Sequence, residues 1–236
     1  NEALLAAWRS FDQMTGADLD DRDRLEILMT KIIFVRHGQT EWNVLGRYQG
    51  QTDVALSPLG IEQAEKLAAH FPVDKIEAVY SSDLARAMKT ASCVADRFGL
   101  TVEPRPELRE LNFGDWEGLT YDEIVAKWPD ALENFFLHPD VLEIPHGESF
   151  PKLRERALAC VEEIVARHPD QTVAVFAHGA ILRTILTAAL HMDLQYVWTI
   201  RQFNTAVNIV TYTEHGTTVE LINGTGHLKY TQEPVD

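Results

Sequence analysis

Cysteine is scarce in this chain, with only Cys93 and Cys160 among its 236 residues. Both fall within stretches of helical spacing, so we expect no disulfide framework and favour a reducing, cytoplasmic location. No run of about 18 apolar residues is present, which argues against a membrane span. The segment 1–30 also lacks the basic and apolar regions that make up a secretory signal.

Positive charge is in short supply as well. The chain has 21 Lys and Arg residues against 36 Asp and Glu residues, a formal net charge of −15. At long range such a surface repels nucleic acid and anionic membranes, so neither is expected as a partner. It also repels a phosphorylated metabolite. Any anion site must therefore be a local concentration of arginine and backbone N–H groups.

Patterns that bind metal ions are missing too. The nine histidines include no His-x-x-x-His pair and no HExxH motif, and the two cysteines lack ligand spacing. His146 and Glu148 form a weak candidate, and a loop that covers a site is the stronger interpretation. We therefore expect no metal ion and no cofactor.

What the sequence does contain is an alternation of strand-like and helix-like segments. It predicts a three-layer α/β/α sandwich around a mostly parallel sheet, with an antiparallel pair at one edge. One domain, residues 31–236, follows an extension, residues 1–30, with a helix expected over Glu2–Met14. The expected strands are Lys31–Arg36, Ile76–Tyr80, Thr101–Arg105, Thr172–Phe176, Ala206–Tyr212 and Thr218–Ile222. The expected helices span residues 57–70, 83–98, 121–127, 130–138, 149–168 and 180–191. Ser57 is expected to cap the first of these helices, and Ser82 or Asp83 the second.

Two of the expected strands end in the same dipeptide. KIIFVRHG carries Arg36 and His37, and TVAVFAHG carries His178 and Gly179. Ligands of open α/β sheets lie outside the carboxyl ends of the strands. A single His after a strand is more often an ordinary loop residue. Because two such ends occur in one chain, the two interpretations, a shared crevice and two ordinary loop residues, have about even odds.

Further polar residues are expected near this crevice. Arg86 lies one turn into the helix that follows a third strand, and with Arg36 it could grip a tetrahedral oxyanion by forked hydrogen bonds. The helix that starts at Ala180 would place its positive end beneath the same anion. Glu110 has apolar residues near it in the sequence and could supply an acid–base group. An exposed carboxylate on a turn is the ordinary interpretation of such a residue.

These segments resemble the histidine phosphatase superfamily, which has the phosphoglycerate mutase-like fold. The run from Arg36 to Asn43, RHGQTEWN, is similar to the family motif RHG-x-T-x-x-N. The resemblance continues through GRYQGQTDVALSPLG, YSSDLARAMKTA, LRELNFGDWEGLTYDEI, HGES and AHGAILR, and it covers about residues 31–208.

The resemblance implies a role for each matching residue. His37 is the nucleophile that becomes phosphorylated, Glu110 is the proton donor and later the base, and the phosphate pocket is formed by Arg36, Arg86 and His178. Asn43, Gln49, Gly50 and Gly179 are expected to bind phosphate or substrate. His146 stands where the family usually has Gly, so it is an expected substrate contact near a lid.

The resemblance also implies a function. We expect a metal-independent phosphatase that hydrolyses a small phosphorylated metabolite through a phosphohistidine, similar to α-ribazole phosphatases, broad-specificity phosphatases and metal-independent phosphoserine phosphatases. A phosphoglycerate mutase and a non-catalytic phosphate-binding module are the alternatives. Dimers are common in such folds, so a homodimer is an open expectation. Trp128, Phe135, Phe136 and His138 are expected mainly to pack an insertion onto the core, and one or two could line a substrate pocket.

Overall fold

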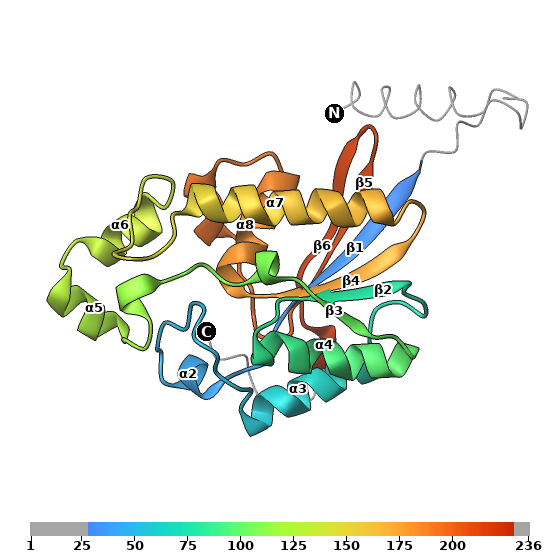
Figure 1. Ribbon diagram of the computed structural model, residues 1–236, viewed down its shortest axis with the longest axis horizontal. Helices are drawn as coiled ribbons and strands as arrows, with labels where there is room; N and C mark the ends of the chain where they lie inside the picture. The colour runs from blue at the N-terminus through green and yellow to red at the C-terminus, as the bar shows by residue number, and fades with distance from the viewer. Residues whose placement is uncertain (1–27, 229–236) are drawn as a thin grey trace, which may run out of the picture.

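The computed structural model describes residues 28–228 (Figure 1). Its six strands form one sheet in the order β3-β2-β4-β1-β5-β6. The first four strands run parallel, and β5 and β6 are each antiparallel to the preceding neighbour. The expected parallel sheet with an antiparallel edge is confirmed. The strands are β1 (Met29–Arg36), β2 (Ala78–Ser81), β3 (Val102–Pro104), β4 (Thr172–Ala177), β5 (Val207–Thr213) and β6 (Gly216–Gly224).

The helices occur in the order that the sequence predicts, with one short addition before the first expected helix. The added helix, α2, begins after Thr40 with a capping box formed by Thr40 and Asn43. The α-helices are α2 (Glu41–Val44), α3 (Pro58–Ala69), α4 (Ala85–Phe98), α5 (Tyr121–Lys127), α6 (Ala131–Leu137), α7 (Phe150–Arg167) and α8 (Gly179–Ala189). Short 3₁₀ turns are η1 (Pro106–Leu108), η2 (Gly114–Trp116), η3 (Leu194–Thr199) and η4 (Gly226–Leu228).

The sheet is covered on both faces, which confirms the three-layer sandwich. Side chains alternate along β1, so Ile33 and Val35 pack in the core under α3 and α4. Ile32 and Phe34 face the opposite core, which contains the buried residues of α7 and α8. Figure 1 shows these two helix pairs on opposite sides of the sheet. Because β1 is buried on both faces, it reads as a continuous apolar run in the sequence.

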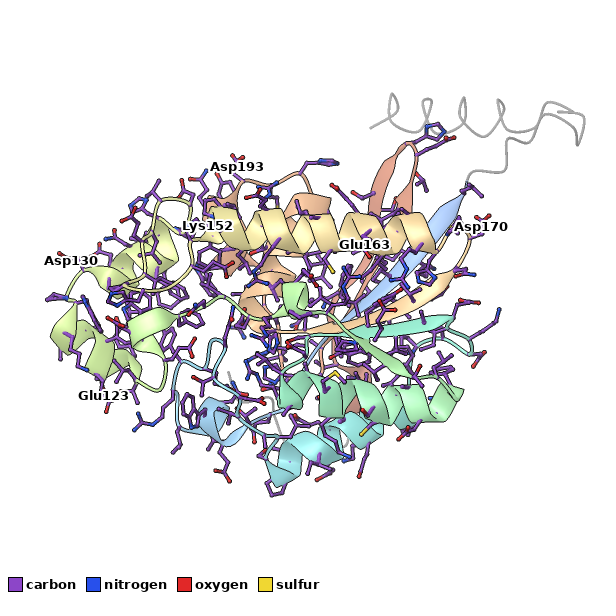
Figure 2. The ribbon with its side chains drawn as sticks, in the orientation of Figure 1. Glu123, Asp130, Lys152, Glu163, Asp170 and Asp193 are labelled. Atoms are coloured by element: carbon purple, nitrogen blue, oxygen red, sulfur yellow. The ribbon has the colours of Figure 1, made fainter. Side chains whose placement is uncertain are left out.

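Helix α7 shows how one amphipathic segment closes this core. Its buried stripe consists of Phe150, Leu153, Ala157, Cys160, Val161 and Ile164, as the helical spacing predicts. Lys152 and Glu163 lie on the exposed face of the same helix (Figure 2). The segment from Thr120 to Pro145, which we call the insertion, carries α5 and α6 and projects beyond the N-terminal end of α7 (Figure 1).

The helix boundaries confirm one predicted cap and correct another. Ser57 caps α3 by accepting a hydrogen bond from the backbone N–H of Gly60. The expected cap of α4 by Ser82 or Asp83 is wrong, because α4 begins at Ala85 without a side-chain cap from its own N-terminus. Asp53 instead accepts the hydrogen bond from the N–H of Ala85. Ser82 and Asp83 bind other side chains, as described below.

The chain before β1 is only partly described. Strand β1 begins at Met29, two residues before the expected domain start, and the helix expected over Glu2–Met14 lies outside the described residues. Cys93 and Cys160 are free thiols. Among residues 28–228, no helix has the length and apolar character that a bilayer crossing requires.

Candidate active site

His37 lies where β1 ends, beside the end of its neighbour β4. The backbone N–H of His37 donates to the carbonyl of Ala177, the last residue of β4, so the two strand ends are joined directly. The side chain is 3% exposed. Its Nδ1 lies 2.7 Å from the backbone carbonyl oxygen of Gly38. Because a carbonyl can only accept, Nδ1 carries the proton, and the lone pair of Nε2 is left for reaction.

His178 occupies the matching position after β4, and the two imidazole centroids are 5.1 Å apart. Its Nδ1 accepts a hydrogen bond from Nε of Arg86 at 3.2 Å, so its Nε2 carries the proton and donates to Ser82 Oγ at 2.8 Å. Both ring nitrogens are therefore engaged by the protein. His178 acts on Arg86 here, which differs from the direct phosphate contact that the family resemblance implies.

Arg86 is held by backbone carbonyls as well as by His178. Its Nη1 donates to the carbonyl of Thr52 at 2.8 Å and its Nη2 to that of Gly50 at 2.7 Å. Burial lowers the pKa of Arg86 to about 10, so the guanidinium is still a cation at neutral pH. Three fixed hydrogen bonds on a buried cation hold it in one orientation, which favours the preorganised binding of an anion.

Arg36 supplies the second buried guanidinium. Its Nη1 donates to the backbone carbonyl of Gln202, and its Nε is buried without a hydrogen-bond partner among the described residues. Burial lowers the pKa of Arg36, and the charge of Glu110 opposes that shift. A buried N–H donor without an acceptor is costly, so an anion bound beside Arg36 would relieve that cost.

The two histidines are neutral at physiological pH. Burial, followed by the positive charges of Arg86 and Arg36, lowers the pKa of His37 well below 6.5. Burial is also the largest cause of the lowered pKa of His178, followed by Arg86. A neutral imidazole retains the Nε2 lone pair that a nucleophile needs, so the same arginines that could bind phosphate also keep His37 reactive.

Glu110 lies in the irregular segment between η1 and η2, with its carboxylate at the N-terminus of α8. Oε2 accepts from the N–H of Ala180 at 3.0 Å, and Oε1 accepts from the N–H groups of Ile181 at 3.2 Å and Leu111 at 2.8 Å. The expectation that this helix end lies beneath a bound anion is thus wrong in one respect. The carboxylate of Glu110 already occupies it, because an anion is stabilised by exposed N–H groups and the helix dipole.

A cavity of about 200 Å³, which we call the His37 pocket, opens between these groups. It is lined by Arg36, His37, Arg86 and Glu110, together with the expected substrate contacts Asn43, Gln49 and Gly50. The structure therefore brings together most of the residues that the sequence singled out. Gln49 Oε1 is buried and has no hydrogen-bond partner within residues 28–228.

Other expected site residues lie outside the lining of this pocket. A Cβ atom added at Gly179 would lie 3.0 Å from Arg183 Nη1 and 3.6 Å from Arg36 Nε. Glycine at this position therefore lets both guanidiniums lie close to the backbone. His146 is 85% exposed, and its Nδ1 lies 3.0 Å from Asp115. The structure does not bring His146 to the His37 pocket.

The aromatic residues of the insertion divide into two groups. Phe135 and Phe136 pack against Trp198, with ring centroids 4.5 Å and 5.4 Å from it. Trp128 and His138 line a separate cavity of about 480 Å³ within the insertion. The expectation that these side chains mainly pack the insertion onto the core therefore holds for the two phenylalanines and for Trp128, which packs against the core as well as lining this cavity.

Three arginines near the site were not recognised from the sequence. Arg183 lies one turn into α8, and burial, followed by the charge of Arg36, lowers its pKa to about 10. Arg47 lines the His37 pocket and pairs with Glu123 of α5 at 3.2 Å. Arg156 of α7 binds the backbone around Glu110. Arg47 and Arg183 fall within the quoted motifs, so they could have been singled out, whereas Arg156 has no local signal.

The residues that the structure describes contain no group of three or more His, Cys, Asp or Glu side chains placed to hold a metal ion. The chemistry of the donor set points the same way, because the His37 pocket is lined by three guanidiniums and a single carboxylate. Such a pocket suits an anion rather than a cation.

Comparisons with known proteins agree with this geometry. The family model of the histidine phosphatase superfamily, branch 1, matches residues 32–225. Phosphoserine phosphatase 1 of Hydrogenobacter thermophilus is 33% identical over 200 residues, which cover 85% of this chain and 95% of that protein. The metal-independent phosphoserine phosphatase of Arabidopsis thaliana is 40% identical over 165 residues, 69% of each chain. The structure of Bacillus stearothermophilus YhfR matches with a TM-score of 0.81 at 32% identity, covering 85% of this chain and 100% of that one.

Proposed function

The chain belongs to branch 1 of the histidine phosphatase superfamily, and we propose that it hydrolyses small phosphomonoesters by transfer of the phosphoryl group to His37 and then to water. The chain is a small-molecule phosphatase of this family. The roles of individual residues are our proposal, and one observation carries it. The Nδ1–H of His37 is held by the Gly38 carbonyl, which directs Nε2 into an arginine-lined cavity.

In the first step, Nε2 of His37 attacks phosphorus and the bond from phosphorus to the ester oxygen breaks. The guanidiniums of Arg36 and Arg86 bind the non-bridging oxygens, over which negative charge is spread in the transition state. Glu110 gives a proton to the leaving alkoxide. His178 acts by holding Arg86 through the hydrogen bond to its Nε.

In the second step, water attacks the phosphorus of phospho-His37 and the P–N bond breaks. Glu110 accepts a proton from that water, so both Glu110 and His37 return to their starting states. Inorganic phosphate then dissociates from Arg36 and Arg86. No metal ion is required in either step, in line with the name of the Arabidopsis relative.

The size and charge of the His37 pocket support a compact substrate. A cavity of about 200 Å³ suits a phosphoester of a few carbon atoms better than a bulky nucleotide-like ester. Arg47 lies at its lining and adds positive charge beyond the two phosphate-binding guanidiniums. We propose an anionic three-carbon phosphoester such as phosphoserine as the leading candidate, which agrees with the named activity of the two relatives.

A panel of phosphoserine, 3-phosphoglycerate and α-ribazole phosphate tests this proposal when it is scored for both released phosphate and isomerised product. We expect phosphate release that survives EDTA and is fastest with the compact anionic esters. Isomerised 3-phosphoglycerate without phosphate release would instead identify a mutase. A cytosolic location and a homodimeric assembly are further proposals, which fractionation and sedimentation measurements would test.

A further inference from the structure

The guanidinium of Arg156, a residue of α7, binds both the backbone of the segment that carries Glu110 and the side chain of Glu148. Its Nη1 donates to the backbone carbonyls of Glu107 at 2.7 Å and Arg109 at 2.8 Å. Its Nη2 donates to the carbonyl of Glu110 at 2.9 Å and to Glu148 at 2.8 Å, while Nε donates to Glu148 at 2.7 Å. All five N–H donors of the guanidinium thus have acceptors, and three of these are consecutive or near-consecutive carbonyls.

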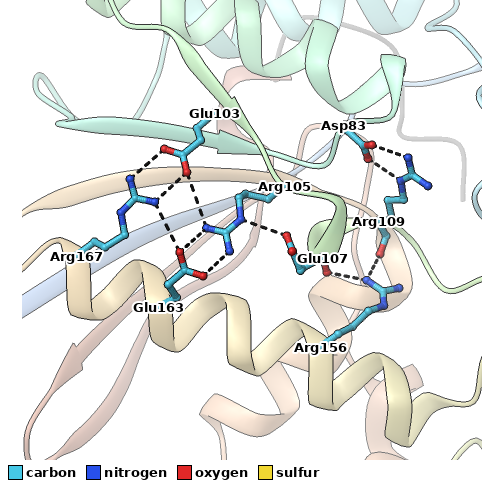
Figure 3. Close-up of polar contacts among 8 residues, drawn as sticks. All are labelled: Asp83, Glu103, Arg105, Glu107, Arg109, Arg156, Glu163 and Arg167. Carbon is cyan, nitrogen blue, oxygen red and sulfur yellow. Dashed lines mark hydrogen bonds and ion pairs between the residues drawn. The ribbon is translucent and has the colours of Figure 1, made fainter.

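The segment needs such support because it belongs to no helix or strand. Residues 109–113 lie between η1 and η2, so no ladder of backbone hydrogen bonds fixes them. Figure 3 shows Arg156 reaching this segment from α7, and Arg109 paired with Asp83 on the far side. Glu148 also binds the segment, since its N–H donates to the carbonyl of Asn112 at 2.9 Å.

Glu110 is consequently held at both ends. Its carboxylate binds the N-terminus of α8, and its backbone carbonyl accepts from Arg156 of α7. Helices α7 and α8 pack side by side on the same face of the sheet. The position of the Glu110 side chain over the His37 pocket therefore depends on two helices that are themselves fixed to each other.

We propose that Arg156, oriented by Glu148, is a positioning residue that sets the place of Glu110 for proton transfer to the leaving group. This inference rests on the proposed role of Glu110 as the acid. Arg156 does not line the His37 pocket, so it acts through the backbone of the Glu110 segment. A displacement of about 1 Å of a reacting group can cost about 100-fold in rate, so loosening this segment affects catalysis without touching the substrate.

The chemistry of the side chain explains why an arginine is needed. A planar guanidinium presents its donors in a fixed fork, whereas a lysine ammonium has three donors at one point. Arg156→Lys keeps the charge but cannot reach three carbonyls and both oxygens of Glu148 at once. The same helix offers a matched control, since Arg167 pairs with Glu103 by two hydrogen bonds and is far along α7 from the Glu110 segment (Figure 3).

The experiment compares Arg156→Lys with Arg167→Lys on two substrates of different leaving-group quality. With an alkyl phosphate such as phosphoserine, the leaving group needs a proton, and we expect kcat/KM of Arg156→Lys to fall about 10- to 100-fold. With p-nitrophenyl phosphate, whose leaving group needs little protonation, kcat/KM should stay within about threefold. The comparison uses kcat/KM because it reports the transfer to His37, whereas kcat also includes hydrolysis of the phosphoenzyme, in which Glu110 acts on both substrates alike. Arg167→Lys should match the wild type on both substrates.

Two further variants make the outcome decisive. Glu148→Gln leaves Arg156 in place and should show the same substrate-selective loss at smaller size, which covers the case in which Arg156→Lys does not fold. In a Glu110→Gln background, Arg156→Lys should cost nothing more, since both changes remove the same step.

Equal losses of kcat/KM on both substrates, or no loss on either, would overturn the positioning role. A Glu110→Gln enzyme without leaving-group selectivity would instead overturn the proposed acid itself.

Discussion

The His37 pocket and the insertion adjoin each other, but different kinds of contact stabilise them. In the pocket, buried charged groups are fixed by backbone carbonyls and N–H groups, as Arg86 and Glu110 illustrate. In the insertion, aromatic rings fix one another, and Phe135 packs on Phe150 and Trp198. Polar anchoring suits a region that must stabilise a developing charge, and aromatic packing suits a region that only has to stay in place.

This contrast predicts whether a substitution should lower the rate of turnover or the stability of the fold. Changes in the pocket should lower turnover at nearly constant stability, and changes in the insertion should lower stability at nearly constant turnover of the folded protein. Arg47 joins the two regions, since it lines the pocket and pairs with Glu123 of α5.

The largest effect on turnover is expected from Arg86→Lys. An ammonium cannot maintain the bonds to Gly50, Thr52 and His178 and also present donors to a phosphoryl group. We expect kcat to fall about 10²- to 10³-fold, by analogy with the loss of one oxyanion donor. Steady-state kinetics with p-nitrophenyl phosphate would measure this fall in kcat. A variant with near-normal kcat would contradict the expected difference between the pocket and the insertion.

The largest effect on stability is expected from Phe135→Ala in the insertion. The side chain is 2% exposed and contacts several other rings, so its loss should cost about 3–5 kcal/mol in the free energy of unfolding. Denaturant unfolding would give that value. The folded fraction should hydrolyse p-nitrophenyl phosphate at close to the normal rate, and a large fall in its kcat at unchanged stability would contradict this division.

A smaller effect is expected from pH, and the two histidines of the active site contribute to it. The pKa values of His37 and His178 are lowered by burial, so between pH 7 and pH 5 the unfolded chain binds protons that the folded chain does not. Stability is therefore fully present above about pH 6.5 and is lost as the pH falls, by up to about 1.4 kcal/mol per pH unit for each proton.

Urea unfolding from pH 7 to pH 5 at high salt, which screens the surface charge, would measure this slope. In His37→Asn the slope should become shallower, because one of the titrating groups is gone. A free energy of unfolding that rises on acidification would contradict the account.

The smallest effect is expected from His146→Ala. This side chain is almost fully exposed and contacts Asp115 rather than the pocket. Its removal should change kcat/KM by no more than about twofold and stability by no more than about 0.5 kcal/mol. A much larger change in KM for phosphoserine would show that His146 reaches the substrate, as was expected from this departure from the family pattern near the lid.

The sequence predicted the part of the site that is carried by strand ends. His37 and His178 follow apolar runs, and the geometry of a parallel sheet brings the ends of neighbouring strands to one edge. The covering helices were equally predictable, because the buried stripe of α7 repeats with helical spacing. These features depend on local patterns and on one general rule of sheet topology.

The remaining features depend on contacts between segments that are far apart in the sequence. Nothing local to Arg156 indicates that it binds carbonyls 46 to 49 residues away. Likewise, Asp83 carries the pattern of a helix cap but pairs with Arg109. The carboxylate of Glu110 occupies the N-terminus of α8 for the same reason, since a tertiary contact overrides the local pattern.

The phosphohistidine itself is the most direct subject for measurement. Protein mixed with phosphoserine or p-nitrophenyl phosphate can be quenched in alkali, in which phosphohistidine survives, and its peptides analysed by mass spectrometry. The account predicts a phosphoryl group on His37 in the wild type and none in His37→Ala. Rapid turnover with no phosphate on His37, or a phosphoryl group on another residue, would contradict it.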